Sequence, residues 1–576
     1  MASWDPRRVG VSAELAGAPV GVAPGSHQNE GGRMASDRER TVVAGGPDQQ
    51  GASAVEGGLG ALVDPDGDRR AIEAEAFDSS RRVAGRAAAG SCSSDDHLAP
   101  RSYPVVGCLL DFYRNRRRLL AWYTGLLAAS PSQTIVVDRL GARRTVVTAN
   151  PANVEHILKA NFGNYPKGKP FTDVLGDLLG GGIFNVDGER WYEQRKLVSH
   201  EFSARVMRET VGTALEREAR ARLVPALYAA ADGGVVVDVQ DLLRQFAFNV
   251  ICRVALGGAD DAGGGVEMAL PLSRLAAAFD TAAAISARRG AAPVAAAWKM
   301  KRALGVGSER RLREEVKVIH DAIMEFIRGS SRRRKRPAAA RRGRDDLLSR
   351  MAATGYPDEA ICDMVVSFIM AGRDTTSSAL TWFFWLMTRH RDVEQEVLDE
   401  IDACMGNGGD GILVGVELEG SRRARVLHAA LCEAMRLYPP VAWDSKHAAE
   451  DDVLPDGTRV GRGDRVTYFP YGMGRMEAIW GADAGDFRPR RWLALPPDGV
   501  SPFKYPVFQG GPRTCLGKEM AFVQMKFVAS AVLRRFELRP VAEGSPEFVP
   551  LLTAHMAGGL KVMVRKRQRR NGTCDR

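Results

Sequence analysis

The chain has 576 residues, of which 45% are hydrophobic, and it carries a net charge of +10 and eight cysteines. This length excludes a single small domain, and cysteines without a C-x-x-C pair or dense spacing argue against a disulfide scaffold. A basic chain suits nucleic acid, an anionic membrane or an acidic protein partner. Its basic residues are spread, and the Arg-rich run at 331–344 is interpreted as a solvated loop. We therefore expect no nucleic-acid partner.

Residues 1–100 differ from the rest of the chain in composition. They are rich in Gly, Ala, Ser, Asp and Arg and show no sustained hydrophobic periodicity. Such a segment buries too little apolar surface to fold, so we expect a low-complexity, disordered extension. It contains no run of about 18 apolar residues and no secretory signal. The folded domain is expected to span residues 101–566, followed by a basic tail at 567–576.

The folded region is predicted to begin with a helix over residues 116–130. Two β-branched runs around a glycine turn, within residues 133–150, predict a β-hairpin. Asn150 and Pro151 fit the cap and the first turn of the next helix. From Asp187 onward most of the chain has a helical pattern, with a second short β region late in the sequence. The fold class predicted is mainly α with small β-sheets.

A long apolar helix is predicted around residues 361–390, and it contains the polar segment AGRDTT at 371–376. Burying an acid and two hydroxyls without a purpose costs free energy. Gly372 weakens the helix, and the Thr375 hydroxyl can bond to a carbonyl of the preceding turn or to a ligand. Local opening of this kind is frequent at functional sites. The alternative is a Ser/Thr-rich kink in a core helix.

Residues 508–517 read FQGGPRTCLG, and several residues in this run have properties that suit a loop that binds haem. Cys515 can supply a thiolate, which donates electron density to haem iron and favours O–O cleavage. Arg513 can grip a haem propionate with its planar guanidinium. Three further positions shield the sulfur or let the chain turn closely against a porphyrin: Phe508, Gly511 and Gly517. A helix predicted to start just after Cys515 would stabilise the thiolate. The alternative is an inert cysteine in a Gly-rich turn.

The pattern Phe-x-x-Gly-x-Arg-x-Cys-x-Gly resembles the haem-binding loop of the cytochrome P-450 monooxygenases, and residues 371–376 resemble the distal helix of that family. The resemblance implies the cytochrome P-450 fold, in which haem lies between a distal and a proximal helix, with Cys515 as the metal ligand. It also assigns four residues to the distal site: Asp374 and Thr375 for proton delivery, and Ala371 and Gly372 for the oxygen pocket.

The resemblance extends to two other groups of residues. Glu433 and Arg436 stand three apart on a predicted helix, and with Arg491 they fill the positions of a buried network that holds the haem-binding core. One departure is Arg490, where the family usually has Glu. Three residues fill positions whose side chains reach the haem propionates: Trp191, Arg195 and Lys446.

Within the family, residues 165–196 and 473–492 resemble the plant fatty-acid omega-hydroxylase clan, including the branch of jasmonoyl-amino-acid hydroxylases. This implies hydroxylation of a fatty acid near its omega end, with non-covalent haem b, dioxygen and electrons from NADPH through a separate NADPH–cytochrome P-450 reductase. No flavin- or nicotinamide-binding fingerprint is visible in the chain. The alternatives are a jasmonoyl-isoleucine hydroxylase, a haem-thiolate hydroperoxide isomerase or dehydratase, and a non-catalytic haem protein.

The resemblance further implies the endoplasmic reticulum membrane as the location, although no transmembrane anchor is visible in the chain. The expected ligand is a lipid-like carboxylate, and a membrane surface is a candidate partner through residues 102–113 and the neighbouring Arg114–Arg118. By the same resemblance, the substrate pocket is expected to come from four segments: Leu175–Asp187, the helix face at Ser367, Phe368 and Ala371, the turn Val441–Trp443, and the loop Leu551–Met556.

Overall fold

The computed structural model describes residues 100–568, with gaps at 139, 141, 200–201, 203–209, 257–271, 293–294, 335–347, 349–350, 352, 354, 406–422 and 497–498. The expected extension at 1–100 lies outside the described residues except for residue 100. Of the expected basic tail, only residues 567 and 568 are described. All described residues belong to one unit of the chain, Arg69–Arg576.

Helices dominate this unit. In chain order they are α2 (Leu109–Arg114), α3 (Leu119–Ala129), α4 (Pro151–Glu155), α5 (Gly168–Leu179), α6 (Gly188–Ser199), α8 (Gly212–Glu218), α9 (Val224–Gly233), α10 (Val239–Leu256), α11 (Leu272–Ala291), α12 (Ala295–Leu304), α13 (Gly307–Arg334), α15 (Asp358–Arg389), α16 (Arg391–Met405), α18 (Arg425–Leu437), α19 (Pro470–Met473), α20 (Glu477–Trp480), α21 (Arg490–Leu493) and α22 (Lys518–Leu533). The prediction of a mainly α fold with small β-sheets is confirmed.

The strands are short and form small sheets. They are β1 (Thr134–Val137), β2 (Thr145–Thr148), β3 (Val236–Asp238), β4 (Asp444–His447), β5 (Asp452–Val453), β6 (Arg459–Val460), β7 (Arg465–Tyr468), β8 (Phe536–Pro540), β9 (Phe548–Val549), β10 (His555–Met556) and β11 (Lys561–Lys566). The largest sheet has the order β1-β2-β7-β4, and a three-stranded sheet has the order β3-β11-β8.

The predicted β-hairpin is present and begins the largest sheet. Strands β1 and β2 pair antiparallel, with Thr134 opposite Thr148, and β7 then adds to β2 in parallel. The helix after the hairpin starts as predicted, because the Asn150 side chain accepts a hydrogen bond from Ala152 N and Pro151 occupies the first turn. The local sequence signals were therefore sufficient for this part of the fold.

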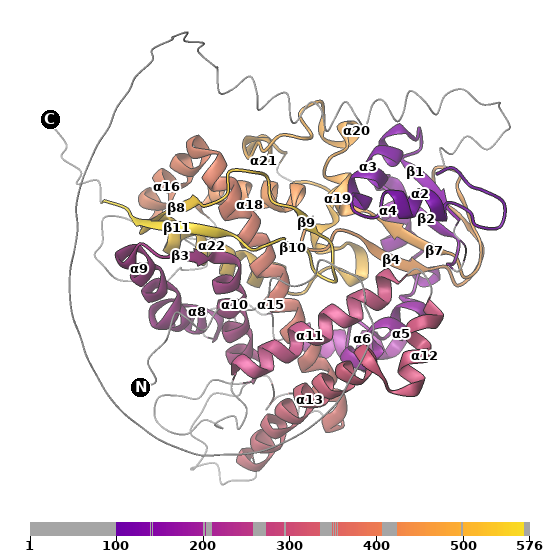
Figure 1. The fold of residues 1–576 in the computed structure, drawn as a ribbon, viewed down its shortest axis with the longest axis horizontal. Coiled ribbons are helices and arrows are strands. Elements are labelled where there is room, and N and C mark those ends of the chain that lie inside the picture. The colour runs from indigo at the N-terminus through magenta and orange to yellow at the C-terminus, as the bar shows by residue number, and fades with distance from the viewer. Residues whose placement is uncertain are drawn as a thin grey trace, which may run out of the picture. The chain divides into compact units, whose positions relative to one another are not determined.

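Helix α15 runs through the centre of the helical region (Figure 1) and packs against α10, α13, α18 and α22. Its second half is covered on all sides, and the aromatic side chains of Trp382, Phe383 and Phe384 are fully buried there. A helix that is apolar around its whole circumference needs such a central position. This placement surrounds the AGRDTT segment with other helices.

Two apolar cores meet beside the predicted cysteine loop. One core lies among the helices around α15, and the other lies under the β1-β2-β7-β4 sheet. Phe503 belongs to the sheet core, whereas Phe508 packs against the helical core. The loop that leads to α22 therefore lies between the two cores. Within the described part of the chain, no helix is both long and apolar enough to cross a bilayer.

Candidate active site

The loop at 508–517 is held in a conformation that requires glycine. Gly511 has a φ of +61°, and an added Cβ there would lie 1.9 Å from the carbonyl oxygen of Leu158. The backbone N–H of Cys515 donates to the carbonyl of Phe508 at 2.9 Å, which closes the loop. The Phe508 ring lies 5.3 Å from that of Phe522 on α22. Helix and loop thus form one support for the cysteine.

Cys515 lies just before the N-terminus of α22, whose cap residue is Gly517. Its side chain is exposed, yet desolvation raises the pKa of its thiol, against the opposing effects of the Gly517 N–H, Arg195 and Lys518. The neighbouring N–H and cations favour a thiolate, and a bound metal ion favours deprotonation further.

Helix α6 brings the predicted Trp191 and Arg195 to this loop. Arg195 Nη2 donates to the carbonyl of Thr514 at 2.6 Å, directly beside the cysteine. Arg513 stacks on the buried Trp191 indole, 4.5 Å from the ring centroid, and pairs with Asp187 at 2.6 Å. The structure therefore gathers three of the predicted haem-contacting side chains around Cys515.

Lys446 lies in a buried polar cluster on strand β4. Its Nζ is 3.0 Å from Asp444 Oδ2, and the same carboxylate accepts from Lys167 Nζ at 2.8 Å and from Tyr468 at 2.9 Å. Gln509 donates to Asp444 at 3.1 Å from a backbone with φ +65° and ψ −170°, a region that non-glycine residues rarely adopt.

Sequence reasoning missed four members of this cluster: Lys167, Asp444, Tyr468 and Gln509. The available signal was the charged sequence DSKH in a strand whose four residues are all buried. Burial of charged residues requires partners, so such a strand indicates a polar cluster. The identity of the partners depends on chain segments almost 300 residues apart.

The cations of this region outnumber its carboxylates. Four basic side chains, Arg195, Arg513, Lys446 and Lys167, face two carboxylates, Asp187 and Asp444, among the residues that the structure describes. Desolvation lowers the pKa values of Arg195 and Arg513 and lowers that of Lys446 to about 7. This excess of basic over acidic side chains favours an anionic ligand, which would also keep Lys446 protonated. The two propionates of haem meet this requirement, so the residues fit the cofactor that the cysteine loop predicts.

The predicted distal residues lie on α15. Thr375 Oγ1 donates to the carbonyl of Ala371 at 2.6 Å, which is the bond to the preceding turn that the sequence allowed. Desolvation raises the pKa of Asp374, and its Oδ1 atom is buried without a hydrogen-bond partner. Gly372 faces α10, where an added Cβ would lie 2.8 Å from Ile251. This contact explains Gly372 by helix packing, and its place in the oxygen pocket stays a prediction.

Glu433 is the centre of the predicted buried network. Its two oxygens accept five hydrogen bonds of 2.8 Å, two of them from Arg436 and the others from Arg491 Nε, Trp492 Nε1 and the backbone N–H of Arg488. The carboxylate and the Arg436 guanidinium are both fully buried. The network thus ties α18 to the segment that precedes the cysteine loop.

Arg436 extends this network to backbone carbonyls. It donates to Gly474, Ala484 (2.6 Å) and Asp486 (2.9 Å). Arg490, the departure from the expected pattern, instead points outward and pairs with Glu396 of α16 at 2.6 Å. The departure therefore leaves the Glu433 network complete.

Comparison with known proteins decides the family. The sequence model of the cytochrome P450 family matches residues 99–557.

The chain belongs to the cytochrome P450 family.

Its relatives include cytochrome P450 94B1 of Arabidopsis thaliana, 55% identical over 81% of this chain and 91% of the relative. Cytochrome P450 94B3 of the same plant is 56% identical, with coverages of 81% and 92%. Cytochrome P450 94A2 of Vicia sativa is 43% identical, with coverages of 81% and 91%. The crystal structure of the cytochrome P450DA heme domain aligns with a TM-score of 0.66, 22% identity and coverages of 82% and 97%, and supports the fold.

This cytochrome P450 is therefore a haem-thiolate monooxygenase that receives electrons from a reductase partner. When bound, the haem supplies the activation of dioxygen, and the protein supplies binding, orientation and electrostatics. The resemblance drawn from the cysteine loop is confirmed at the level of family, enzyme class and cofactor.

Two of the segments expected to form the substrate pocket of this cytochrome P450 make a hydrogen bond to a residue that lies near another of these segments. The Gly181 N–H donates to Asp363 on α15 at 2.7 Å, and the Ala554 N–H donates to the carbonyl of Pro440 at 2.8 Å. Ser367 is fully buried, and an added Cβ on Gly182 would lie 2.3 Å from its hydroxyl. We therefore expect Phe368, rather than Ser367, to contact a ligand.

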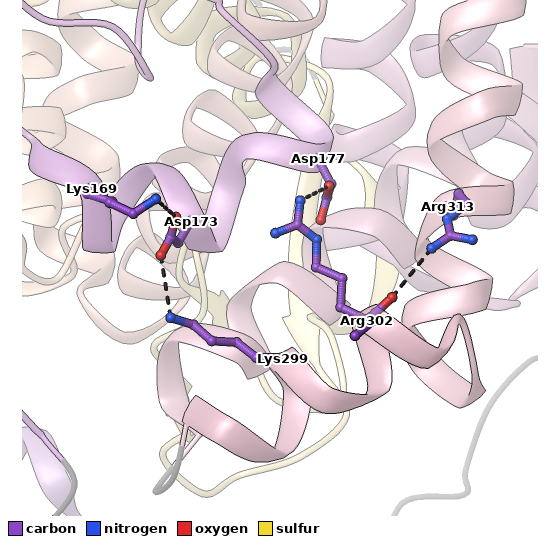
Figure 2. A pocket seen from close by; sticks show the side chains of 7 residues that line it. Lys169, Asp173, Asp177, Lys299, Arg302 and Arg313 are labelled. Carbon is purple, nitrogen blue, oxygen red and sulfur yellow. Dashed lines mark hydrogen bonds and ion pairs between the residues drawn. The ribbon is translucent and has the colours of Figure 1, made fainter.

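A concave region of this cytochrome P450 lies at α5, α12 and α13 and has a volume of about 610 Å³. Figure 2 shows that ion pairs cross it, with Lys299 reaching Asp173 at 3.5 Å and Arg302 reaching Asp177 at 2.7 Å. Its charged lining does not suit a porphyrin or a hydrocarbon chain, so we assign it no part in the chemistry.

Replacement of Thr375 by alanine is expected to keep the haem spectrum and divert reducing equivalents to peroxide. Loss of positioned proton transfer typically costs roughly 100- to 10,000-fold in rate, so the product formed per NADPH should fall steeply. The measurement is product, peroxide and NADPH in the same reaction. Thr388→Ala, which removes a similar hydroxyl bonded to Trp385 far along the same helix, is the matched control. Unchanged coupling in Thr375→Ala would contradict the assignment.

Proposed function

We propose that this cytochrome P450 hydroxylates a fatty acid, or a carboxylate derived from one, near its omega end. The observation that carries the proposal is a set of incompletely buried apolar side chains in or next to the expected pocket segments. Phe171 and Val174 of α5, Phe368 of α15, and Phe548 and Leu552 of the late segment all pack against the helical core without being fully covered. Such a lining suits a hydrocarbon chain.

The proposed roles follow from the contacts of each side chain. Cys515 is the iron ligand, and Trp191, Arg195, Arg513 and Lys446 hold the propionates, with Lys167 and Asp444 keeping Lys446 in place. Phe508, Gly511 and Gly517 shape the loop. Ala371 and Gly372 leave room beside α15 for dioxygen. Asp374 and Thr375 deliver protons. Glu433, Arg436 and Arg491 attach the segment that precedes the cysteine loop to α18. Electrons come from NADPH through NADPH–cytochrome P-450 reductase at the endoplasmic reticulum.

Spectral titration of the holoenzyme with fatty acids of several chain lengths tests the substrate class, followed by mass analysis of the products. Methyl esters of the same acids are the matched controls, because they keep the chain and lose the carboxylate. We expect the acids to shift the haem spectrum and to gain oxygen near the omega carbon. Jasmonoyl conjugates are tested in a second arm of the same experiment. Residues 165–196 and 473–492 resemble the fatty-acid omega-hydroxylase clan, which includes the jasmonoyl-amino-acid hydroxylases. A lack of binding and turnover in both arms would refute the proposal.

We further expect the haem to be held without a covalent bond. Animal fatty-acid omega-hydroxylases often carry at this helix position a Glu that forms an ester with a haem methyl, whereas this chain has Ala371. A methyl side chain cannot form that ester. Extraction with acid and organic solvent should therefore release free haem, measured by its absorbance in the organic phase. Ala371→Glu is the informative counterpart, and haem that stays with the unaltered protein would contradict this expectation.

Val441→Trp is expected to change the carbon that is attacked or the preferred chain length. Val441 lies in the turn after α18, next to Pro440, which contacts the late loop, so a larger side chain there narrows the space expected for the substrate. The measurement is the product profile with a series of fatty acids. Val541→Trp makes the same change at a residue that is 54% exposed, and it should leave the profile unaltered. An identical profile for Val441→Trp would remove this turn from the proposed pocket.

A further inference from the structure

An ion-pair network joins α10, α11 and α15 beside the polar segment of α15. Arg373 is buried, and its Nη2 lies 2.8 Å from Asp280 Oδ1 on α11. Arg244 of α10 pairs with the same carboxylate oxygen. Asp280 is 40% exposed, whereas the Arg373 side chain is 5% exposed. Asp280 therefore binds a buried cation from the solvent side.

Asp374 lies at the edge of this network, where its ion pair with Arg373 is long. Arg373 Nε is 3.6 Å from Asp374 Oδ1, too far for a hydrogen bond, and both atoms are buried without a hydrogen-bond partner. Two unsatisfied, oppositely charged groups this close would normally form a charge-assisted bond. Adjacent side chains of a helix point in different directions, and the ion pair with Asp280 fixes the Arg373 guanidinium toward α11, so Nε stops short of Asp374.

We propose that Asp280 is a positioning residue for proton delivery, because it holds Arg373 away from Asp374 and so leaves the Asp374 carboxyl able to carry a proton. This inference rests on the proposed role of Asp374. A full hydrogen bond from Arg373 Nε to Asp374 would fix that group as a carboxylate. The ion pair of Nη2 with Asp280 keeps the guanidinium where Nε stops 3.6 Å short of Asp374 Oδ1.

The surrounding charges agree with this reading. The groups that face Asp374 are Arg373, Arg244 and Asp280, and desolvation is the largest cause of its raised pKa, which the two arginines oppose and Asp280 supports. Farther out, Cys252 of α10 neighbours Arg373, and His555 of β10 neighbours Arg244. Loss of the Asp280 charge thus acts in the same direction as release of Arg373, since both lower the pKa of Asp374.

Infrared titration of the ferric holoenzyme tests the proposal. The carbonyl band of protonated Asp374 is identified by its loss in Asp374→Asn, and its intensity is followed against pH. We expect Asp280→Asn to shift this titration to lower pH and Arg373→Met to shift it to higher pH. Asp280→Glu keeps the negative charge and should retain the original curve. Asp402→Asn, which breaks an exposed ion pair with Arg534 elsewhere, should change nothing.

The combined variant separates a hold on Arg373 from a direct effect of the Asp280 charge. Asp280→Asn together with Arg373→Met should fall below Arg373→Met alone only by the direct effect of the lost Asp280 charge, and a fall as large as that of Asp280→Asn below the unaltered protein would overturn the proposal. An unchanged titration in Asp280→Asn would also overturn it. If Arg373→Met does not fold, the contrast between Asp280→Asn and Asp280→Glu decides the outcome.

The product formed per NADPH gives the functional readout. We expect Asp280→Asn to lower it about tenfold, less than the roughly 100-fold minimum for loss of a catalytic acid, with Asp280→Glu close to the original. Coupling that stays constant while the titration moves would overturn the role in proton delivery. The infrared experiment needs no substrate, so a wrong substrate class would leave its result intact, and the two failures are distinguishable.

Discussion

Cys515→Ala is expected to abolish the ferrous–carbon monoxide absorption band that is characteristic of thiolate ligation, together with all monooxygenase turnover. The alanine has no atom that can bind iron, and the N–H groups and cations around Cys515 would then face no thiolate. The measurement is the carbon monoxide difference spectrum of the reduced protein, with total haem determined separately.

Cys404→Ala is the matched control. Cys404 is also an exposed cysteine that forms no disulfide, but it lies on α16, away from the loop. It should retain both the band and the turnover. Persistence of the thiolate band in Cys515→Ala would show that another group binds the iron and would refute the site proposed above.

Glu433→Ala is expected to destabilise the protein by about 3–5 kcal/mol, the usual cost of removing one partner from a buried ion pair. The change leaves the buried Arg436 guanidinium without its carboxylate and removes five hydrogen bonds from one point. The measurement is the midpoint of thermal or denaturant unfolding, with haem retention as a second observable. We expect poor haem incorporation, because the segment before the cysteine loop loses its attachment to α18.

Glu396→Ala removes a carboxylate from an exposed pair with Arg490 in the same part of the fold. It should leave the unfolding midpoint unchanged, because exposed ion pairs contribute little. Equal midpoints for Glu433→Ala and the unaltered protein would contradict the structural role of the network. A change equal to that of Glu396→Ala would mean that Glu433 is no more important than a surface residue.

The strongest sequence signals describe groups that lie close together along the chain. The loop FQGGPRTCLG, the Asn150 cap and the β-branched hairpin each use residues within about 20 positions, so spacing alone predicts them. Gly511 illustrates the point, since a Gly-rich loop predicts a tight turn. The reason for that particular glycine, the approach of the Leu158 carbonyl, appears only in the fold.

The tertiary structure decided which charged groups, far apart in the sequence, form ion pairs. Lys167 and Asp444 are 277 residues apart and form a buried pair, and Asp280 reaches Arg373 from another helix. Side-chain type and spacing cannot identify such partners, because burial and Coulomb energy depend on distance in space. The sequence by itself determined the family and the mainly α fold class, and it predicted the loop around Cys515 that we propose binds iron. Only the packing of α6, β4 and α15 with their neighbours determined the excess of basic side chains near the loop and the lack of a hydrogen bond to Asp374 Oδ1, because both depend on groups from separate segments.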